Sequence, residues 1–343
     1  MPGLKGVHLG LGLAVLVAGW ASTALFGIRN AAAAAPASSM QSPAAWSVPD
    51  IDTLPDDAWG RTVRQGRDLI VRTAELIGPM AANPAARYAG NNLACQSCHI
   101  DGGTRKFGLP LVGAFAAYPN YRARSGQVGT IEERINGCVR RSLNGRPLPP
   151  DSAEMTAMVA YLKFLSIGRP VGSRTEGQGP GQMPELARAA DPARGGQLFA
   201  GQCAACHGVN GDGQRDGSGK PGYVVPPLWS ADSFNDGAGM ARLTNAANFI
   251  HNNMPDGTTW AAPAISVTDS WDIAAYIESW PRPHMADLDR DFPNRSEKPA
   301  DTPYGPYADS FGASQHKYGP FQPIRDGIAA QRSAGSGPAK PRR

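Results

Sequence analysis

The sequence predicts an all-α protein made of two tandem domains of the same design, joined by a flexible linker and followed by an extended C-terminal tail. Three observations carry this prediction. A short pattern of two cysteines and a histidine occurs twice, at 95–99 and at 203–207. Each copy lies between segments with the apolar periodicity of helices. A stretch rich in Gly, Ser, Thr, Gln and Pro, without periodicity, separates the two units.

Both patterns have the form Cys-x-x-Cys-His. In this arrangement the two thiols add to the vinyl groups of a haem, and the histidine supplies the proximal imidazole to the iron. One copy alone could be a redox dithiol or half of a zinc site. Two copies, each next to helical segments, predict two cytochrome c domains with two covalently bound haem c groups, attached through Cys95, Cys98, His99, Cys203, Cys206 and His207.

The composition agrees with two modest domains. Of the 343 residues, 41% are hydrophobic, which is enough for two cores, while 31 Pro and 41 Gly predict many loops. The net charge is only +4, and the chain has no Lys/Arg-rich run of the kind that binds a phosphate backbone. Nucleic acid is therefore not an expected partner.

The N-terminal segment, 1–40, has the features of an export signal. Lys5 precedes an apolar run at 9–28, and small residues follow at 31–35, where a signal peptidase could cut. The run is also long enough for one membrane span. A cleaved signal peptide and an uncleaved membrane anchor both stay open, and both predict a periplasmic protein.

The first haem domain is predicted at 41–171. Asp56 and Asp57 are suitable N-caps for its first helix. A second helix is expected at 130–142, where Thr130 and Glu133 have the spacing of a capping box. A third is expected at 152–165.

The linker is predicted at 172–190 and the second haem domain, for electron transfer, at 191–285. Helices are expected at 194–201, 243–252 and 268–280. Tyr161 follows His99 by 62 residues, and Tyr276 follows His207 by 69, each within a similar apolar triplet. These matching offsets indicate an internal duplication. The rest of the chain, 286–343, is predicted to be an extended tail over the body, with disorder from about residue 331.

The distal iron ligands differ between the two domains. Met254 precedes a proline after the 243–252 helix, where a c-type cytochrome presents its thioether sulfur. Packing in the core is the alternative role for this methionine. The first domain has Leu148 at the matching place, and Met155 and Met158 lie inside a helix and are expected to be core. Cys138 is the remaining candidate for that iron.

A thiolate ligand from Cys138 would give a low-potential haem, whereas the plainer alternative is a buried free cysteine. The segment around it is crowded with arginines, and only two glutamates oppose them. Such a run is usually a solvated helix face, but guanidinium groups also bind oxyanions and lower a cysteine pKa. The pattern favours an anionic substrate beside a reactive sulfur; the arginines are Arg122, Arg124, Arg134, Arg140, Arg141 and Arg146.

Cys138, with Arg134 four residues before it and Ser142 four after, resembles the thiosulfate dehydrogenases that form tetrathionate. The resemblance spans both haem domains and most of the tail, including 144–149, 291–295, 303–307 and 315–320. It implies that Cys138 is the distal ligand of the active-site haem and that Arg124, Arg134 and Ser142 bind substrate. Some members place an exchangeable lysine ligand beside the second-haem methionine. Asn252 and Asn253 stand there in this chain, so no ligand exchange is inferred.

The resemblance implies that two thiosulfates join and that two electrons pass to an external acceptor, such as a small cytochrome c. The same site could run in reverse as a tetrathionate reductase. One alternative is a dihaem electron carrier, which predicts a Met on both haems and no arginine cluster. Another is the Cys-ligated haem subunit of a sulfur-oxidising complex. The tail and Met254 favour the dehydrogenase.

Overall fold

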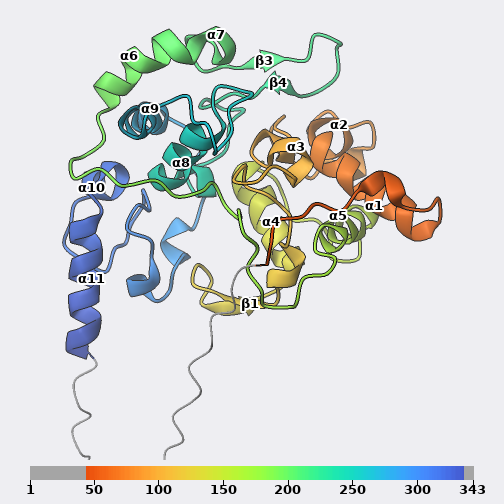
Figure 1. Cartoon of the computed structure of the whole chain (residues 1–343), viewed down its shortest axis with the longest axis horizontal. Coiled ribbons are helices and arrows are strands. Elements are labelled where there is room, and N and C mark those ends of the chain that lie inside the picture. Colours follow the sequence, from red (N-terminus) through yellow and green to blue (C-terminus); the bar gives the residue numbers. More distant parts are fainter. Residues whose placement is uncertain (1–43, 336–343) are drawn as a thin grey trace, which may run out of the picture. The chain divides into compact units, whose positions relative to one another are not determined.

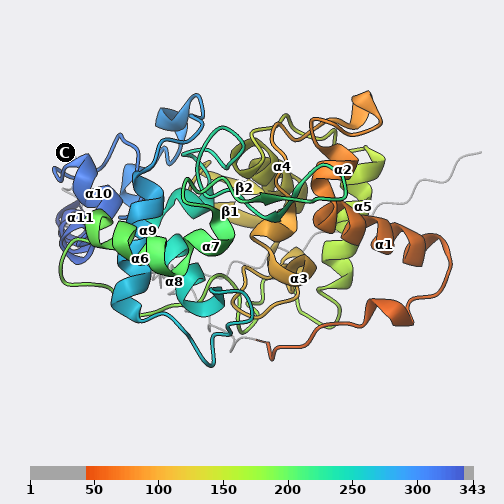
Figure 2. The same ribbon diagram turned by 90° about the horizontal axis from the view of Figure 1, so that it is seen from above.

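The computed structural model describes residues 44–335, so the predicted export segment lies outside the described residues. Figures 1 and 2 show the first five helices gathered in one group and the next four in another. The first group consists of α1 (Ala58–Val71), α2 (Thr73–Ile77), α3 (Ile100–Gly103), α4 (Ile131–Ser142) and α5 (Ala153–Phe164). The second consists of α6 (Pro192–Gln202), α7 (Ala204–His207), α8 (Leu243–Asn253) and α9 (Val267–Ser279).

Strands contribute only two short antiparallel hairpins within the described residues. One pairs β1 (Asn120–Arg122) with β2 (Gln127–Gly129), and the other pairs β3 (Gln214–Arg215) with β4 (Tyr223–Val225). The predicted all-α class is therefore confirmed. Short 3₁₀ turns occupy Ile51–Thr53, Pro84–Ala86, Cys95–Ser97, Phe115–Ala117, Gly239–Ala241, Leu288–Arg290 and Arg295–Glu297. No helix between 44 and 335 is long and apolar enough to cross a membrane.

The helices begin where their capping residues predict. The Asp57 carboxylate accepts the Gly60 N–H at 2.8 Å and starts α1. At the start of α4, the Thr130 N–H donates to Glu133 at 2.9 Å and the Glu133 N–H donates to the Thr130 hydroxyl at 3.3 Å. Ser152 caps α5. These local hydrogen bonds satisfy N–H groups that have no partner inside the helix.

The two domains repeat one helix crossing, which supports the internal duplication. In the first domain α1 packs against α5, and in the second α6 packs against α9. A Cβ added at Gly66 would lie 2.0 Å from the Ala157 carbonyl oxygen, and one at Gly195 would lie 1.8 Å from that of Asp272. Only glycine allows the helix backbones to approach this closely. The two matched tyrosines follow one turn after these carbonyls, as Tyr161 and Tyr276.

The segment between the domains is irregular, and its middle part contacts both domains. The Phe107 N–H donates to the Gly177 carbonyl at 2.9 Å, and the Asn252 amide donates to the Pro180 carbonyl at 2.7 Å. Composition predicts the lack of regular structure, whereas these contacts depend on side chains and loops far away in the sequence.

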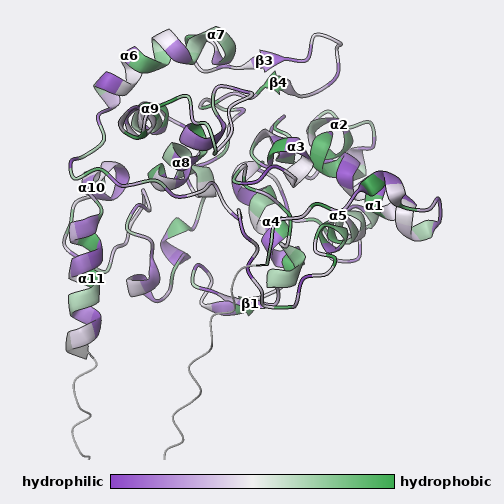
Figure 3. Cartoon of the chain, viewed as in Figure 1, coloured by the Kyte–Doolittle hydropathy of each residue, from purple (hydrophilic) through white to green (hydrophobic). Residues whose placement is uncertain are grey.

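The tail is more ordered than predicted, since its described part contains two helices, α10 (Ala313–Tyr318) and α11 (Gln322–Gly335). Ile324 and Ile328, one turn apart, are buried in the core of the second domain. Figure 3 shows hydrophilic and hydrophobic residues alternating along α11. Disorder was expected from residue 331, but 331–335 are helical; residues 336–343 lie outside the described residues.

A segment of the second domain completes the core of the first. Phe234, Ala238 and Ala241 are buried in the same apolar cluster as Val139 and Leu143, which flank the end of α4. The helix that contains Cys138 is thus packed against residues about 100 positions away.

Candidate functional site

The first attachment motif places its histidine for metal binding. Cys95 begins a 3₁₀ turn and His99 follows one turn later. The His99 Nδ1 lies 2.5 Å from the Leu109 carbonyl oxygen. A carbonyl only accepts hydrogen bonds, so Nδ1 carries the proton and Nε2 keeps its lone pair for iron. The sequence did not identify Leu109 as the residue that orients this ring.

The second motif repeats the arrangement. His207 ends α7, and its Nδ1 lies 3.1 Å from the Pro226 carbonyl oxygen. Both accepting carbonyls stand directly before a proline, Pro110 and Pro227. This shared X-Pro position after each motif is the sequence signal that could have identified the two orienting groups.

The surroundings of the attachment cysteines suit a haem. Burial raises the pKa of Cys95 to about 11 and that of Cys98 to about 12, and it raises the pKa of Cys203 to about 11. Such shifts arise where water is excluded and apolar groups surround the sulfur. Together with the carbonyl that holds Nδ1 of each histidine, these surroundings fit a covalently bound porphyrin.

The Cys138 thiol lies against the proximal histidine of the first motif. Burial alone would raise its pKa, but the Arg134 charge, the hydrogen bond and charge of His99, and the Arg122 charge lower it to about 6. The Arg134 Nη1 donates to the Cys138 Sγ at 2.8 Å. This geometry brings together the two residues predicted as proximal and distal ligands of one iron.

The helix α4 positions the sulfur and two of the predicted substrate-binding residues. Arg134, Cys138 and Ser142 are spaced four residues apart, which places them on one face of the helix. Ser142 is the last residue of α4, and its carbonyl accepts the Asn91 side-chain amide at 3.0 Å. Tyr118 also hydrogen-bonds Arg134, and sequence reasoning did not single it out.

Arg124 is held by the tail. Its Nη1 lies 2.8 Å from the Asp291 carboxylate and 2.7 Å from the Tyr304 hydroxyl. Arg141 contacts the same carboxylate, and Arg146 donates to the Ala85 carbonyl. The predicted arginine cluster is therefore divided: Arg134 and Arg122 act on the Cys138 sulfur, whereas Arg124 and Arg141 meet at the tail.

Met254 follows α8 directly and packs against the core of the second domain. In the first domain, Leu148 is fully buried, and Met155 and Met158 lie in the same core, as expected for packing residues. These positions leave Met254 and Cys138 as the distal candidates of the two domains.

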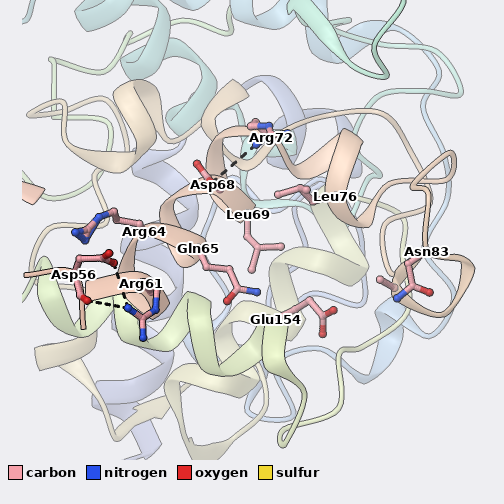
Figure 4. A pocket seen from close by; sticks show the side chains of 11 residues that line it. Asp56, Arg61, Arg64, Gln65, Asp68, Leu69, Arg72, Leu76, Asn83 and Glu154 are labelled. Atoms are coloured by element: carbon pink, nitrogen blue, oxygen red, sulfur yellow. Dashed lines mark hydrogen bonds and ion pairs between the residues drawn. The ribbon is translucent and has the colours of Figure 1, made fainter. Parts of the chain in front are cut away.

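A cleft of about 630 Å³ lies along α1 (Figure 4). None of the predicted site residues lines it. Two of its arginines are paired with aspartates that also line it, Arg61 with Asp56 and Arg72 with Asp68.

Family models match both haem domains. Residues 86–171 match the family described as SoxA/TsdA, cytochrome c domain, and residues 192–281 match the cytochrome c family. These matches and the geometry of the two motifs together establish two covalently bound haem c groups.

Similar proteins cover most of the chain. A thiosulfate dehydrogenase from Stutzerimonas stutzeri is 41% identical over 235 residues, 68% of this chain and 72% of that protein. The solved thiosulfate dehydrogenase TsdBA from Marichromatium purpuratum is 32% identical with a TM-score of 0.65; the similarity covers 80% of this chain and 57% of that one. An L-cysteine S-thiosulfotransferase subunit SoxA from Rhodovulum sulfidophilum matches only 33% of this chain, at 39% identity. The length and identity of the first match show that this chain belongs to the thiosulfate dehydrogenase family.

Proposed function

We propose that this protein is a dihaem enzyme that oxidises two thiosulfate ions to one tetrathionate and passes two electrons to an external acceptor. The reaction is 2 S₂O₃²⁻ → S₄O₆²⁻ + 2 e⁻. The observation that carries the proposal is the Cys138 sulfur, which lies against His99 and accepts a 2.8 Å hydrogen bond from Arg134. The candidate distal sulfur, the histidine that would hold the iron and a guanidinium group thus lie in contact.

The arginines beside Cys138 offset the electrostatic repulsion between two thiosulfate dianions. Two unit charges 4 Å apart repel by about 4 kcal/mol in a protein-surface dielectric, and two dianions repel by about four times as much. Arg134 and Arg122 both favour negative charge at the sulfur of Cys138. Guanidinium groups fixed before substrate arrives offset this repulsion without reorganising during the reaction.

The bound haems supply two one-electron acceptors, which matches the two electrons released. Within the protein, Cys138 is the residue that can hold a substrate sulfur. Its thiolate and one thiosulfate form Cys–S–S–SO₃⁻ with loss of two electrons. A second thiosulfate then attacks the substrate-derived sulfur bonded to Cys138, releases tetrathionate and restores the thiolate. Arg134 stays within hydrogen-bond distance of the cysteine sulfur for this exchange.

Two alternatives have less support. A simple electron carrier predicts a methionine at both distal positions, but Leu148 is a core residue and Cys138 faces His99. The haem subunit of a sulfur-oxidising complex is similar to this chain only over a third of its length. Reduction of tetrathionate would use the same residues in the reverse direction.

The proposal includes an electron acceptor and a cellular location for the protein. A small soluble cytochrome c in the periplasm fits a protein whose second haem has a thioether candidate ligand. The apolar segment within 1–40 supports export, either as a cleaved signal peptide or as a membrane anchor. Separating periplasmic and membrane fractions of expressing cells, and sequencing the N-terminus of the mature protein, would distinguish these forms.

The haem content is directly measurable. We expect two haems per chain, and both should stay on the protein after acid-acetone extraction, because each is held by thioether bonds. The double variant Cys95→Ala/Cys98→Ala should retain only the second haem. The double variant Cys203→Ala/Cys206→Ala should retain only the first haem. Release of haem from the wild-type protein would contradict covalent attachment.

Replacing Met254 by glycine should alter only the second haem. We expect loss of the methionine–iron absorption band near the red edge of the oxidised spectrum and a lower potential for that haem, since loss of a thioether ligand stabilises the oxidised iron. Redox titration with optical detection measures both. Met183→Gly is the matched control, because Met183 packs against the same core. An unchanged spectrum in Met254→Gly would make Met254 a core residue.

A further inference from the structure

Two arginines of the predicted cluster, Arg124 and Arg141, converge on one carboxylate of the tail. The Arg124 Nη1 lies 2.8 Å from the Asp291 Oδ2, and the Arg141 Nη2 lies 2.7 Å from the Asp291 Oδ1. The Asp291 side chain is 10% exposed, so water screens these ion pairs only weakly. Each oxygen of the carboxylate thus has its own guanidinium partner.

Further contacts fix Arg124 in both its side chain and its backbone. Its Nη1 donates to the Tyr304 hydroxyl at 2.7 Å, and that hydroxyl donates to Asp291 at 2.6 Å. The Arg124 carbonyl accepts the Phe292 N–H at 2.8 Å. Within the described part of the chain, the three side-chain hydrogen bonds of Arg124, including one to the Gly237 carbonyl, all use Nη1. Its Nη2 and Nε make no hydrogen bond there and are left for an oxyanion.

Four distant parts of the chain meet here. Arg124 lies between β1 and β2, Arg141 lies on α4 three residues after Cys138, and Asp291 belongs to the tail. Gly237 of the second domain accepts both guanidiniums at 3.2 Å. Asn235, two residues earlier, donates to the Arg140 and Arg141 carbonyls; these bonds cap the last turn of the helix that contains Cys138.

The charges of this cluster do not cancel. Two guanidiniums face one carboxylate, which leaves an excess positive charge beside α4. Without Asp291, the two arginines would repel each other and their side chains would lose their common anchor. An arginine that is held in place by charge-assisted hydrogen bonds binds an oxyanion with less loss of conformational entropy than a free one.

We propose that Asp291 is a positioning residue for substrate binding, which bridges Arg124 and Arg141 and so holds Arg124 ready for the thiosulfate dianion at Cys138. The tail and the second domain thereby complete the substrate site of the first domain. This inference rests on the proposed thiosulfate oxidation and adds a residue that does not touch the substrate itself.

Asp291→Asn tests the inference in the full-length holoprotein. Asparagine keeps the shape but has no charge and accepts at one oxygen only. We expect the KM for thiosulfate to rise about 10-fold, as for the loss of one charge-assisted contact, while kcat changes less than about threefold. Both haem spectra should stay as in the wild type, because no ligand is altered. Tyr304→Phe should raise KM by a smaller factor.

Asp301→Asn is the matched control. Asp301 is another buried aspartate of the tail; it accepts the Arg242 Nη2 at 2.5 Å and the Thr244 N–H at 3.1 Å. Its loss weakens the attachment of the tail without touching Arg124, so KM should stay within about twofold of wild type. An equal rise of KM in both aspartate variants would reduce Asp291 to a structural role and overturn the inference.

A wild-type KM in Asp291→Asn would overturn it as well. If Asp291→Asn does not fold, the KM of Tyr304→Phe for thiosulfate is compared with the values of the wild type and of Asp301→Asn instead. A KM of Tyr304→Phe equal to that of the wild type would overturn the inference. Failure of the proposed function is distinguishable, since wild-type protein would then form no tetrathionate from thiosulfate with an artificial acceptor.

Discussion

Cys138→Gly should form no measurable tetrathionate, with a loss of at least about 1,000-fold in kcat, as is typical when a reacting nucleophile is removed. Both haems should remain attached, because Cys138 is not one of the four attachment cysteines. The measurement is thiosulfate-dependent reduction of an artificial acceptor, together with the haem content of the purified variant. Thiosulfate oxidation at the wild-type rate would rule out the proposed mechanism.

Cys138→Met separates iron ligation from sulfur chemistry. A thioether can occupy the distal position, and because it donates less charge than a thiolate, the potential of the first haem should rise. The variant should still be nearly inactive, since a thioether cannot form and release a bond to a substrate sulfur. A Cys138→Met variant with substantial activity would show that the cysteine acts only as a ligand.

Arg134→Ala should lower kcat/KM for thiosulfate by about 10- to 100-fold, as expected for the loss of a hydrogen bond from a charged donor. The variant removes the 2.8 Å contact to the Cys138 sulfur and with it the cation beside that sulfur. Both haems should stay attached. Steady-state kinetics with thiosulfate and an artificial acceptor measure the effect.

Two variants control for this change. Arg140→Ala removes an exposed arginine from the same helix, two residues after Cys138, and should have kinetics close to wild type. Arg134→Lys keeps the charge but loses the planar pair of donors, so its kcat/KM should fall between those of Arg134→Ala and the wild type. Equal losses in Arg134→Ala and Arg140→Ala would mean that only the general positive charge of α4 matters.

The starts of the helices were predictable from short sequence patterns. Asp57, Thr130 and Ser152 start their helices in the structure as the sequence predicts, because an N-cap hydrogen bond spans only two or three residues. The tail shows the opposite. Prolines near 303–307 correctly exclude a helix there, but α11 forms because Ile324 and Ile328 enter the core of the second domain. That burial is not visible in a local pattern.

In the candidate site, too, some features follow from local spacing and others depend on the tertiary fold. Spacing along α4 was enough to place Arg134 and Cys138 on one face, since the helical period is fixed. Arg124 was predicted as a substrate ligand through family resemblance alone, and its partner Asp291 was quoted only as part of a matching motif. Those two residues are 167 positions apart, so their ion pair depends on how the tail folds back.

The sequence by itself determined the chemistry of this protein: two haem attachment motifs, one spare cysteine and a methionine candidate, each recognised from neighbours a few residues away. The tertiary structure decided which groups act together. It set His99 against Cys138, turned Arg134 to that sulfur and tied Arg124 to Asp291. The physical reason is that attachment and capping depend on short-range geometry, whereas charge pairing depends on which distant segments exclude water together.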